Sequence, residues 1–229
     1  MSHLARFIFI TTFPLIWQFE AVGQTPQDVA KQTLPSIVVL VSETGNGKPV
    51  ALGSGFFVRK DVIATNFHVI KGASQIRARV VGQSRSHPIK RILAFDGRKD
   101  LALLLVSGLE GTPLWIGNSC GIEVGDTVFA VGNPKGLEGT FSQGTVSAIR
   151  KLKGNRYIQI TAPVSEGSSG GPVLNESGEV IGIAVASVRQ GQNLNFAVSG
   201  LDLEVIILKT VGAGFGVSDI ADLVDCINL

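Results

Sequence analysis

The chain has 229 residues, of which 45% are hydrophobic and 17% are charged, and it contains 28 glycines. This composition is typical of a folded, turn-rich protein and excludes a disordered one. The formal net charge is only +2 and the Lys and Arg residues are scattered, so we expect no nucleic-acid partner. No stretch reaches the roughly 18 uninterrupted apolar residues of a membrane span.

The N-terminus has the pattern of a secretory signal peptide. His3 and Arg6 precede an apolar run over residues 7–17, and Ala21-Val22-Gly23 places small residues before a cut ahead of Gln24. We therefore expect residues 1–23 to be a signal peptide, the protein to be exported, and the processed chain to have no stable membrane span. A membrane anchor that is not cleaved and an ordinary buried segment are the alternative interpretations.

Strand-like segments dominate the rest of the chain. After a short helix expected over residues 26–32, six short segments rich in apolar and β-branched residues are each bounded by Gly, Asp, Lys or Ser. A Gly-rich polar break over residues 107–126 separates them from six more. The expected strands are residues 36–41, 53–58, 62–66, 76–81, 89–95, 101–106, 127–132, 141–149, 157–162, 171–174, 180–188 and 195–198.

Two equal sets of short strands without intervening helices favour an all-β fold, either a sandwich or barrels. We predict two six-stranded antiparallel β-barrels, the first over about residues 36–110 and the second over about 120–200. A helical tail over 200–229 would follow, with one helix over 199–211 and a short amphipathic one over 218–227.

Cys120 and Cys226 are the only two cysteines. An exported protein could pair them, and two free buried thiols are the alternative. No Cys/His cluster has the spacing of metal ligands, so we expect neither a metal site nor a cofactor.

Residues 166–172 read Glu-Gly-Ser-Ser-Gly-Gly-Pro and are poorly suited to a strand or a helix. They suit a tight turn that exposes a hydroxyl beside converging backbone N–H groups. Nucleophilic acyl transfer needs an accessible serine Oγ and preorganised donors for the oxyanion that develops. An ordinary Gly/Ser-rich surface loop is the alternative.

A serine nucleophile needs a base, and the chain has three histidines. His3 would leave with the signal peptide, and His87 precedes a proline in an expected surface turn. His68 follows a buried-looking strand and is the candidate general base.

A carboxylate must then orient the imidazole and stabilise the imidazolium. Asp100 stands directly before the apolar strand expected over 101–106, where its backbone would be held rigidly. Asp61, in a turn, and Asp96, in a looser segment, are the rivals.

The order of these residues separates two serine-hydrolase folds. Residues 167–171 also fit the Gly-x-Ser-x-Gly elbow of α/β-hydrolases, in which the acid and the histidine follow the serine. No histidine follows Ser169 here, and strand–helix alternation is missing. The order His68, Asp100, Ser169 is that of the chymotrypsin-like template. The first barrel would supply the base and the acid, and the second barrel the serine, so we expect the site between them.

Eight segments, in order, cover roughly residues 36–200 and resemble the chymotrypsin-fold serine proteases, within them the HtrA (DegP-like) branch. The segments are residues 53–56, 65–70, 100–104, 131–137, 144–148, 167–173, 178–183 and 195–198. The resemblance implies a chymotrypsin-like double barrel forming a trypsin-like protease domain over residues 24–229.

The resemblance also implies a role for each matching residue. His68 would be the general base, Asp100 its orienting acid, Ser169 the nucleophile, and the N–H groups of Gly167 and Ser169 the oxyanion hole. Polypeptide substrates, protein quality control in the periplasm or outside the cell, and a homotrimer as a candidate assembly are implied in the same way.

The sequence departs from the HtrA pattern at three places. Ser168 stands where the family usually has Asn or Asp, so two serines are adjacent. We expect no C-terminal PDZ domain. The long N-terminal loop of the family is absent, which does not favour assembly into a cage.

The pocket for the side chain before the scissile bond is expected between residues 162–165 and 183–187. Val164, Ile183, Ala184 and Ala186 would line it, and because they are small or apolar we expect a preference for Val, Ala or Ile. Loops 150–156, 163–168 and 188–193 would border the site and become ordered when substrate binds.

The sequence therefore predicts a serine endopeptidase that cleaves unfolded or flexible polypeptides. A chaperone-like or pseudo-protease binder of exposed hydrophobic segments is the alternative, and an esterase on the same fold is a third.

Overall fold

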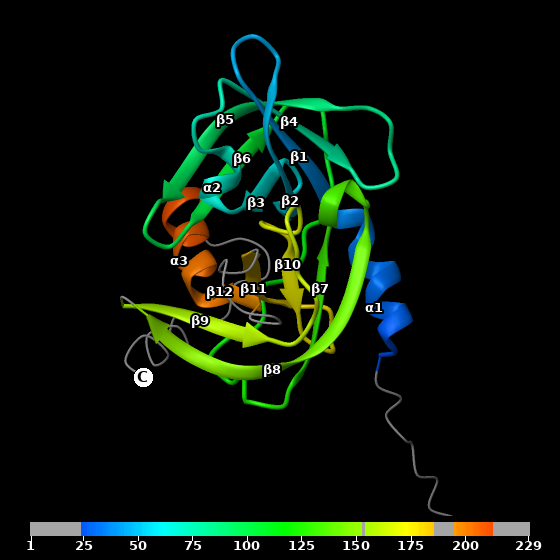
Figure 1. The fold of residues 1–229 in the computed structure, drawn as a ribbon, viewed down its shortest axis with the longest axis vertical. Coiled ribbons are helices and arrows are strands. Elements are labelled where there is room, and N and C mark those ends of the chain that lie inside the picture. The colour runs from blue at the N-terminus through cyan, green and yellow to red at the C-terminus, as the bar shows by residue number, and fades with distance from the viewer. Residues whose placement is uncertain (1–23, 153, 186–194, 213–229) are drawn as a thin grey trace, which may run out of the picture.

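The computed structural model describes residues 24–152, 154–185 and 195–212 (Figure 1). In this part of the chain, strands form two closed six-stranded barrels with antiparallel neighbours. The prediction of an all-β double barrel is confirmed. The expected signal peptide and the expected helix over 218–227 lie outside the described residues.

The first barrel closes in the order β1-β2-β3-β6-β5-β4. Its core holds large apolar side chains from alternate positions of these strands, among them Leu40, Phe57, Ile63 and Leu104. The strands are β1 (Ile37–Glu43), β2 (Pro49–Arg59), β3 (Val62–Thr65), β4 (Gln75–Val80), β5 (His87–Asp96) and β6 (Leu101–Val106).

The second barrel closes in the order β10-β11-β12-β9-β8-β7. Its own core contains Val128, Ile158, Ile160 and Val173. The strands are β7 (Thr127–Gly132), β8 (Thr140–Leu152), β9 (Asn155–Ile160), β10 (Pro172–Leu174), β11 (Val180–Val185) and β12 (Asn195–Ser199).

A third apolar cluster joins the two barrels. It packs Phe56 and Leu103 of the first barrel with Phe129, Leu174 and Ile183 of the second. Since interior packing of this kind resists sliding, the barrels hold residues on their facing ends in a fixed relation. A site shared between the barrels can therefore be rigid.

Two strands extend furthest beyond the bounds that the sequence predicts. β2 begins at Pro49 rather than 53, and β8 runs to Leu152 rather than 149. Both extensions are exposed hairpin arms, which pair with β1 and β9 respectively. Because neither arm has one buried face, the alternating hydrophobic pattern that marks a strand is missing there.

Short helices complete the fold. Helix α1 (Pro26–Thr33) agrees with its prediction to one residue and starts with a capping box between Thr25 and Asp28. Helix α3 (Gly200–Val211) packs against β11 and β12. Two 3₁₀ turns, η1 (Leu34–Ser36) and η2 (Pro134–Gly136), are also present. Among the described helices, none is long and apolar enough to cross a bilayer.

Outside the site, the structure corrects the interpretation of one residue, His87, and bears on the open question of whether Cys120 is paired. His87 is buried at the start of β5 rather than exposed in a turn, with Nδ1 3.3 Å from the Ser107 carbonyl oxygen. Cys120 is disulfide-bonded, which favours the paired alternative. The other cysteine, Cys226, lies outside the described residues.

Candidate active site

His68 and Asp100 meet where two neighbouring strands of the first barrel end and begin. His68 lies in the short helix α2 (Phe67–Ile70) directly after β3, and Asp100 directly precedes β6, which pairs with β3. Asp100 Oδ2 lies 2.6 Å from His68 Nδ1. Asp100 Oδ1 also accepts a hydrogen bond from the His68 backbone N–H at 2.8 Å. The carboxylate therefore fixes both the ring and the backbone of the histidine.

The backbone of Asp100 is held in an uncommon conformation, with a φ of 56°. Its carbonyl oxygen accepts hydrogen bonds from Asn66 Nδ2 at 2.9 Å and from Phe67 N–H at 3.2 Å. Together with the two contacts to His68, these bonds offset a backbone cost of about 1 kcal/mol or more. Asp100 is thus anchored to the segment that carries the histidine.

The rival aspartates have other positions. Asp96 Oδ1 accepts hydrogen bonds from the N–H groups of Arg98 and Lys99 at 2.8 and 3.1 Å and closes the turn before Asp100. Burial, the largest single cause, acts to raise the pKa of Asp96, but these two hydrogen bonds and the positive charges of Lys99 and Arg98 together hold the pKa below its ordinary value. Asp61 lies in the turn between β2 and β3. Of these three aspartates, Asp100 is the one whose carboxylate contacts His68.

Ser169 lies in the turn before β10, and this turn rests on the first barrel. Ser54 of β2 donates its backbone N–H to the Ser169 carbonyl at 2.8 Å. A Cβ on Gly170 would lie 2.2 Å from both Ser54 O and Thr65 Oγ1 and 3.2 Å from Asn66 N. Gly170 also has a φ of 88°, so only glycine fits there. The turn therefore touches the residues that lead into His68.

The three residues predicted to form a triad are thus brought to one junction between the barrels. Ser168 and Ser169 are 7% and 4% exposed. Both residues are more buried than the sequence predicts, because the turn packs against the first barrel. Isolated glycine and serine residues in a sequence do not reveal such packing.

The peptide groups around Gly167 are held from two sides. Lys135, in η2, donates its N–H to the Glu166 carbonyl at 2.8 Å, and Ser54 Oγ donates to the Gly167 carbonyl at 2.7 Å. Gly167 has a φ of 94°, and a Cβ there would lie 2.4 Å from Asn133 O. Since C=O and N–H point to opposite sides of a trans peptide, the Gly167 N–H points away from Lys135.

The residues expected to line the substrate pocket do not all come together. Val164 and Ala184 lie in one buried cluster of the second barrel. Ile183 packs instead in the cluster between the barrels, because successive side chains of a strand point to opposite faces. Ala186 lies outside the described residues.

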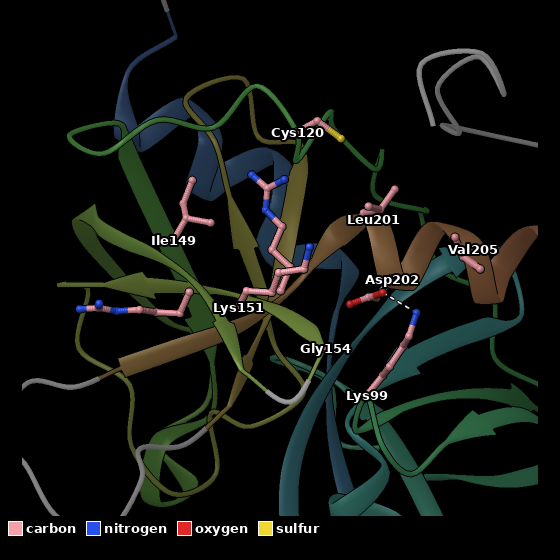
Figure 2. A pocket seen from close by; sticks show the side chains of 10 residues that line it. Lys99, Cys120, Ile149, Lys151, Gly154, Leu201, Asp202 and Val205 are labelled. Atoms are coloured by element: carbon pink, nitrogen blue, oxygen red, sulfur yellow. Dashed lines mark hydrogen bonds and ion pairs between the residues drawn. The ribbon is translucent and has the colours of Figure 1, made fainter. Parts of the chain in front are cut away.

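A pocket of about 540 Å³ lies beside the segment that carries Asp100 (Figure 2). The β8–β9 hairpin and helix α3 form its walls, and Lys99 makes an ion pair with Asp202 of α3 at 2.5 Å. The cationic side chains Lys99, Arg150, Lys151 and Arg156 surround it. Asp100, His68 and Ser169 do not line this pocket, which reaches only Lys99, the neighbour of Asp100 in the chain.

No cluster of three His, Cys, Asp or Glu residues able to hold a metal occurs within residues 24–152, 154–185 and 195–212. The carboxylate of Asp100 can orient the imidazole of His68 and stabilise its charged form.

Residues 53–183 match the family of the trypsin-like peptidase domain. This match covers more than half of the chain, and the chain belongs to that family. Within the family it is an HtrA-like domain, as its relatives and structural neighbours show.

Two curated relatives illustrate the similarity. A probable periplasmic DegP-like serine endoprotease of Pseudomonas fluorescens is 41% identical over 138 residues, which cover 58% of this chain and 29% of the relative. The chloroplastic Protease Do-like 1 of Arabidopsis thaliana is 36% identical over 149 residues, covering 60% and 34%. The chain thus spans about a third or less of the length of these relatives.

Two solved structures share the fold. The serine endoprotease of Yersinia pestis is 28% identical with a TM-score of 0.71, covering 85% of this chain and 69% of that one. The HtrA-type protease AlgW, solved with a tripeptide, is 27% identical with a TM-score of 0.73, covering 82% and 64%.

Sequence reasoning missed the residues that support the candidate site. Ser54 and Asn133 form the buried hydrogen bonds beneath the turn, and each is separated by many residues from the groups it contacts. Both residues lie in segments that resemble the HtrA branch, 53–56 and 131–137, but nothing in the sequence indicates that their side chains meet.

Proposed function

We propose that this domain is a serine endopeptidase that hydrolyses peptide bonds of unfolded or flexible polypeptides. The observation that carries the proposal is the double contact of Asp100 with the ring and backbone of His68, beside the turn that holds Ser169. Membership of the trypsin-like peptidase family supports the same assignment.

In the proposed reaction, Ser169 Oγ attacks the scissile carbonyl carbon while its proton passes to His68 Nε2. Asp100 accepts a hydrogen bond from His68 Nδ1–H and stabilises the imidazolium. The negatively charged oxygen of the tetrahedral intermediate faces the N–H groups of Gly167 and Ser169.

His68 then donates the proton to the leaving amine, and an acyl group remains on Ser169. Water attacks the acyl carbon and gives a proton to His68. His68 then returns this proton to Ser169 Oγ as the bond between Oγ and the acyl carbon breaks, which releases the carboxylic acid and the free serine. The carboxylate of Asp100 stays ionised throughout.

The proposed setting is protein quality control outside the cytoplasm, supported by the periplasmic relatives. Small aliphatic side chains before the cut are the proposed preference, supported by the apolar surroundings of Val164 and Ala184.

The test is cleavage of an unfolded, casein-like protein by residues 24–229, with mass spectrometry to map the cuts. We expect cleavage after small aliphatic residues, and its loss in Ser169→Ala. Ser168→Ala is the matched control, since the Ser168 turn bonds use only its backbone N–H and C=O. It should cleave at a rate close to the unsubstituted domain.

Equal rates for the unsubstituted domain and Ser169→Ala would contradict the endopeptidase assignment. Binding of the unfolded protein without cleavage would then favour the chaperone-like function. Faster hydrolysis of small esters than of peptides would favour the esterase.

A further inference from the structure

Ser54 lies at the centre of β2 and is completely buried, yet its hydroxyl has three hydrogen-bond partners. Ser54 Oγ lies 2.7 Å from the Gly167 carbonyl oxygen, 2.9 Å from Asn133 N and 3.0 Å from Asn133 Nδ2. These partners all belong to the second barrel, whereas Ser54 belongs to the first. The hydroxyl therefore connects the two barrels directly beneath the Ser169 turn.

The direction of each of these bonds is determined by chemistry. A serine hydroxyl offers one donor and two acceptor positions. Both Asn133 atoms are nitrogen donors, so they occupy the acceptor positions. The hydroxyl proton must then go to the Gly167 carbonyl, and the hydrogen-bonding capacity of Ser54 is filled.

Asn133 is fixed in turn by its own contacts. Its Nδ2 also donates to the Val38 carbonyl of the first barrel at 3.2 Å, and its Oδ1 accepts from Gly139 N–H at 3.0 Å. Donors and acceptors are matched on both ends of the amide, so the orientation of the side chain is unambiguous. The Ser54 hydroxyl is held by a partner that cannot rotate away.

The Gly167 carbonyl belongs to the peptide that links Gly167 to Ser168, and its orientation sets how the backbone passes to Ser169. The preceding peptide is held by the bond from Lys135 to Glu166. The Gly167 N–H belongs to this preceding peptide, whereas the Ser54 bond holds the following peptide, which lies between the Gly167 N–H and the Ser169 N–H. Ser54 therefore fixes the direction of these two N–H groups relative to each other. An oxyanion hole depends on such preorganisation, because donors that must reorient during the reaction lose their advantage.

We propose that Ser54, supported by Asn133, is a positioning residue that orients the backbone of Gly167 for the developing oxyanion. This inference rests on the proposed peptidase function and adds a residue to it. Ser54 does not touch the reacting atoms. It acts by holding the Gly167 peptide through its carbonyl, so its removal should affect the transition state more than the binding of substrate.

The first test compares kcat and KM of Ser54→Ala with the unsubstituted domain on one peptide substrate. We expect kcat to fall roughly tenfold to a hundredfold, less than the loss of an oxyanion donor itself, with KM changed less than about threefold. Ser119→Ala is the matched control. Ser119 is also a buried serine, and its hydroxyl accepts from Leu201 N–H at 2.8 Å away from the candidate site.

A second measurement separates positioning from general loosening of the fold. A peptide aldehyde forms a hemiacetal with Ser169 whose oxygen lies where the oxyanion develops, whereas the peptide acid released by cleavage forms no such adduct. We expect Ser54→Ala to lose aldehyde affinity by the same factor as kcat and to keep its affinity for the peptide acid.

Ser54→Cys covers the case in which Ser54→Ala does not fold, since a buried thiol is similar in size and donates weakly. We expect its kcat to lie between those of Ser54 and Ser54→Ala. A folded Ser54→Cys enzyme with unchanged kcat and unchanged aldehyde affinity would overturn the inference, as would equal losses in Ser54→Ala and Ser119→Ala. Inactivity of the unsubstituted domain would instead count against the proposed function.

Discussion

Asp100 contacts His68 twice, with one carboxylate oxygen 2.6 Å from the ring Nδ1 and the other accepting the backbone N–H at 2.8 Å. A carboxylate with one contact could orient the ring only. The second contact ties the position of the ring to the backbone of α2, and it makes the direction of the carboxylate independent of the protonation of His68.

Replacement of this carboxylate gives the first prediction. Asp100→Asn should keep the shape of the side chain but present an N–H or a weaker acceptor to Nδ1, which favours the wrong tautomer. We expect kcat on a peptide substrate to fall by about four orders of magnitude at neutral pH, with little change in KM. The control is Asp96→Asn, which changes the neighbouring turn instead, and its kcat should fall far less. Equal losses of kcat in the two variants would contradict the assignment of Asp100.

The second prediction concerns the contact of Gly170 with the first barrel. Gly170→Ala would place a Cβ 2.2 Å from Ser54 O and from Thr65 Oγ1, at a φ of 88°. Overpacking and a left-handed backbone together should lower the free energy of unfolding by about 3 kcal/mol. Urea denaturation measures this. Gly121→Ala is the control, since nothing lies within 4 Å of its added Cβ, and it should change stability little.

The third prediction uses an ion pair between the barrels. Arg79 of β4 binds Glu138, in the loop before β8, through both guanidinium nitrogens, one of them at 2.8 Å. The hydrogen bond from Arg79 is the largest cause that lowers the pKa of Glu138 below its ordinary value of 4.5. A lowered carboxylate pKa contributes stability that is present above the unfolded pKa and is lost as pH falls through the folded pKa.

Glu138→Gln should therefore be less stable than the unsubstituted domain at pH 7, by up to about 1 kcal/mol because the pair is partly exposed. The difference should shrink as pH falls below 4.5. Thermal unfolding of both proteins between pH 7 and about pH 3 provides the measurement. A difference that stays constant over this range would show that the pair does not stabilise the fold through the charge of Glu138.

The fourth prediction concerns Lys99 and Asp202, the ion pair drawn in Figure 2. It ties the segment that ends in Asp100 to helix α3. A double-mutant cycle with Lys99→Met and Asp202→Asn should give a coupling free energy of about 1 kcal/mol. We also expect kcat of Lys99→Met to fall a few-fold, because the turn before Asp100 becomes less constrained. A coupling free energy near zero would show that the ion pair between Lys99 and Asp202 does not stabilise the fold.

The barrels could be predicted because their signal is repeated. Short segments bounded by turn residues recur in two equal sets, and the structure forms them into two closed barrels. His68 and Asp100 could be chosen from their rivals because Asp100 directly precedes a strongly apolar strand and His68 follows another by a few residues. Neighbouring strands bring these ends together.

What could not be predicted depends on contacts between distant residues. The left-handed backbone of Asp100 and the four-residue helix α2 have no periodic signal. The three bonds of the Ser54 hydroxyl require the second barrel to be in place. The opposite facing of Ile183 and Ala184 follows from strand geometry once β11 is known to be buried on both faces.

The order of the two barrels along the chain also determines the order in which the site residues are synthesised and folded. β6, the last strand of the first barrel, ends at Val106, whereas Ser169 follows three strands of the second. A chain that emerges and folds from its N-terminus therefore holds the proposed base and acid long before it holds a nucleophile. Under the proposed function, no unfinished copy can cleave its neighbours, and the order of the strands delays hydrolysis until both barrels are closed.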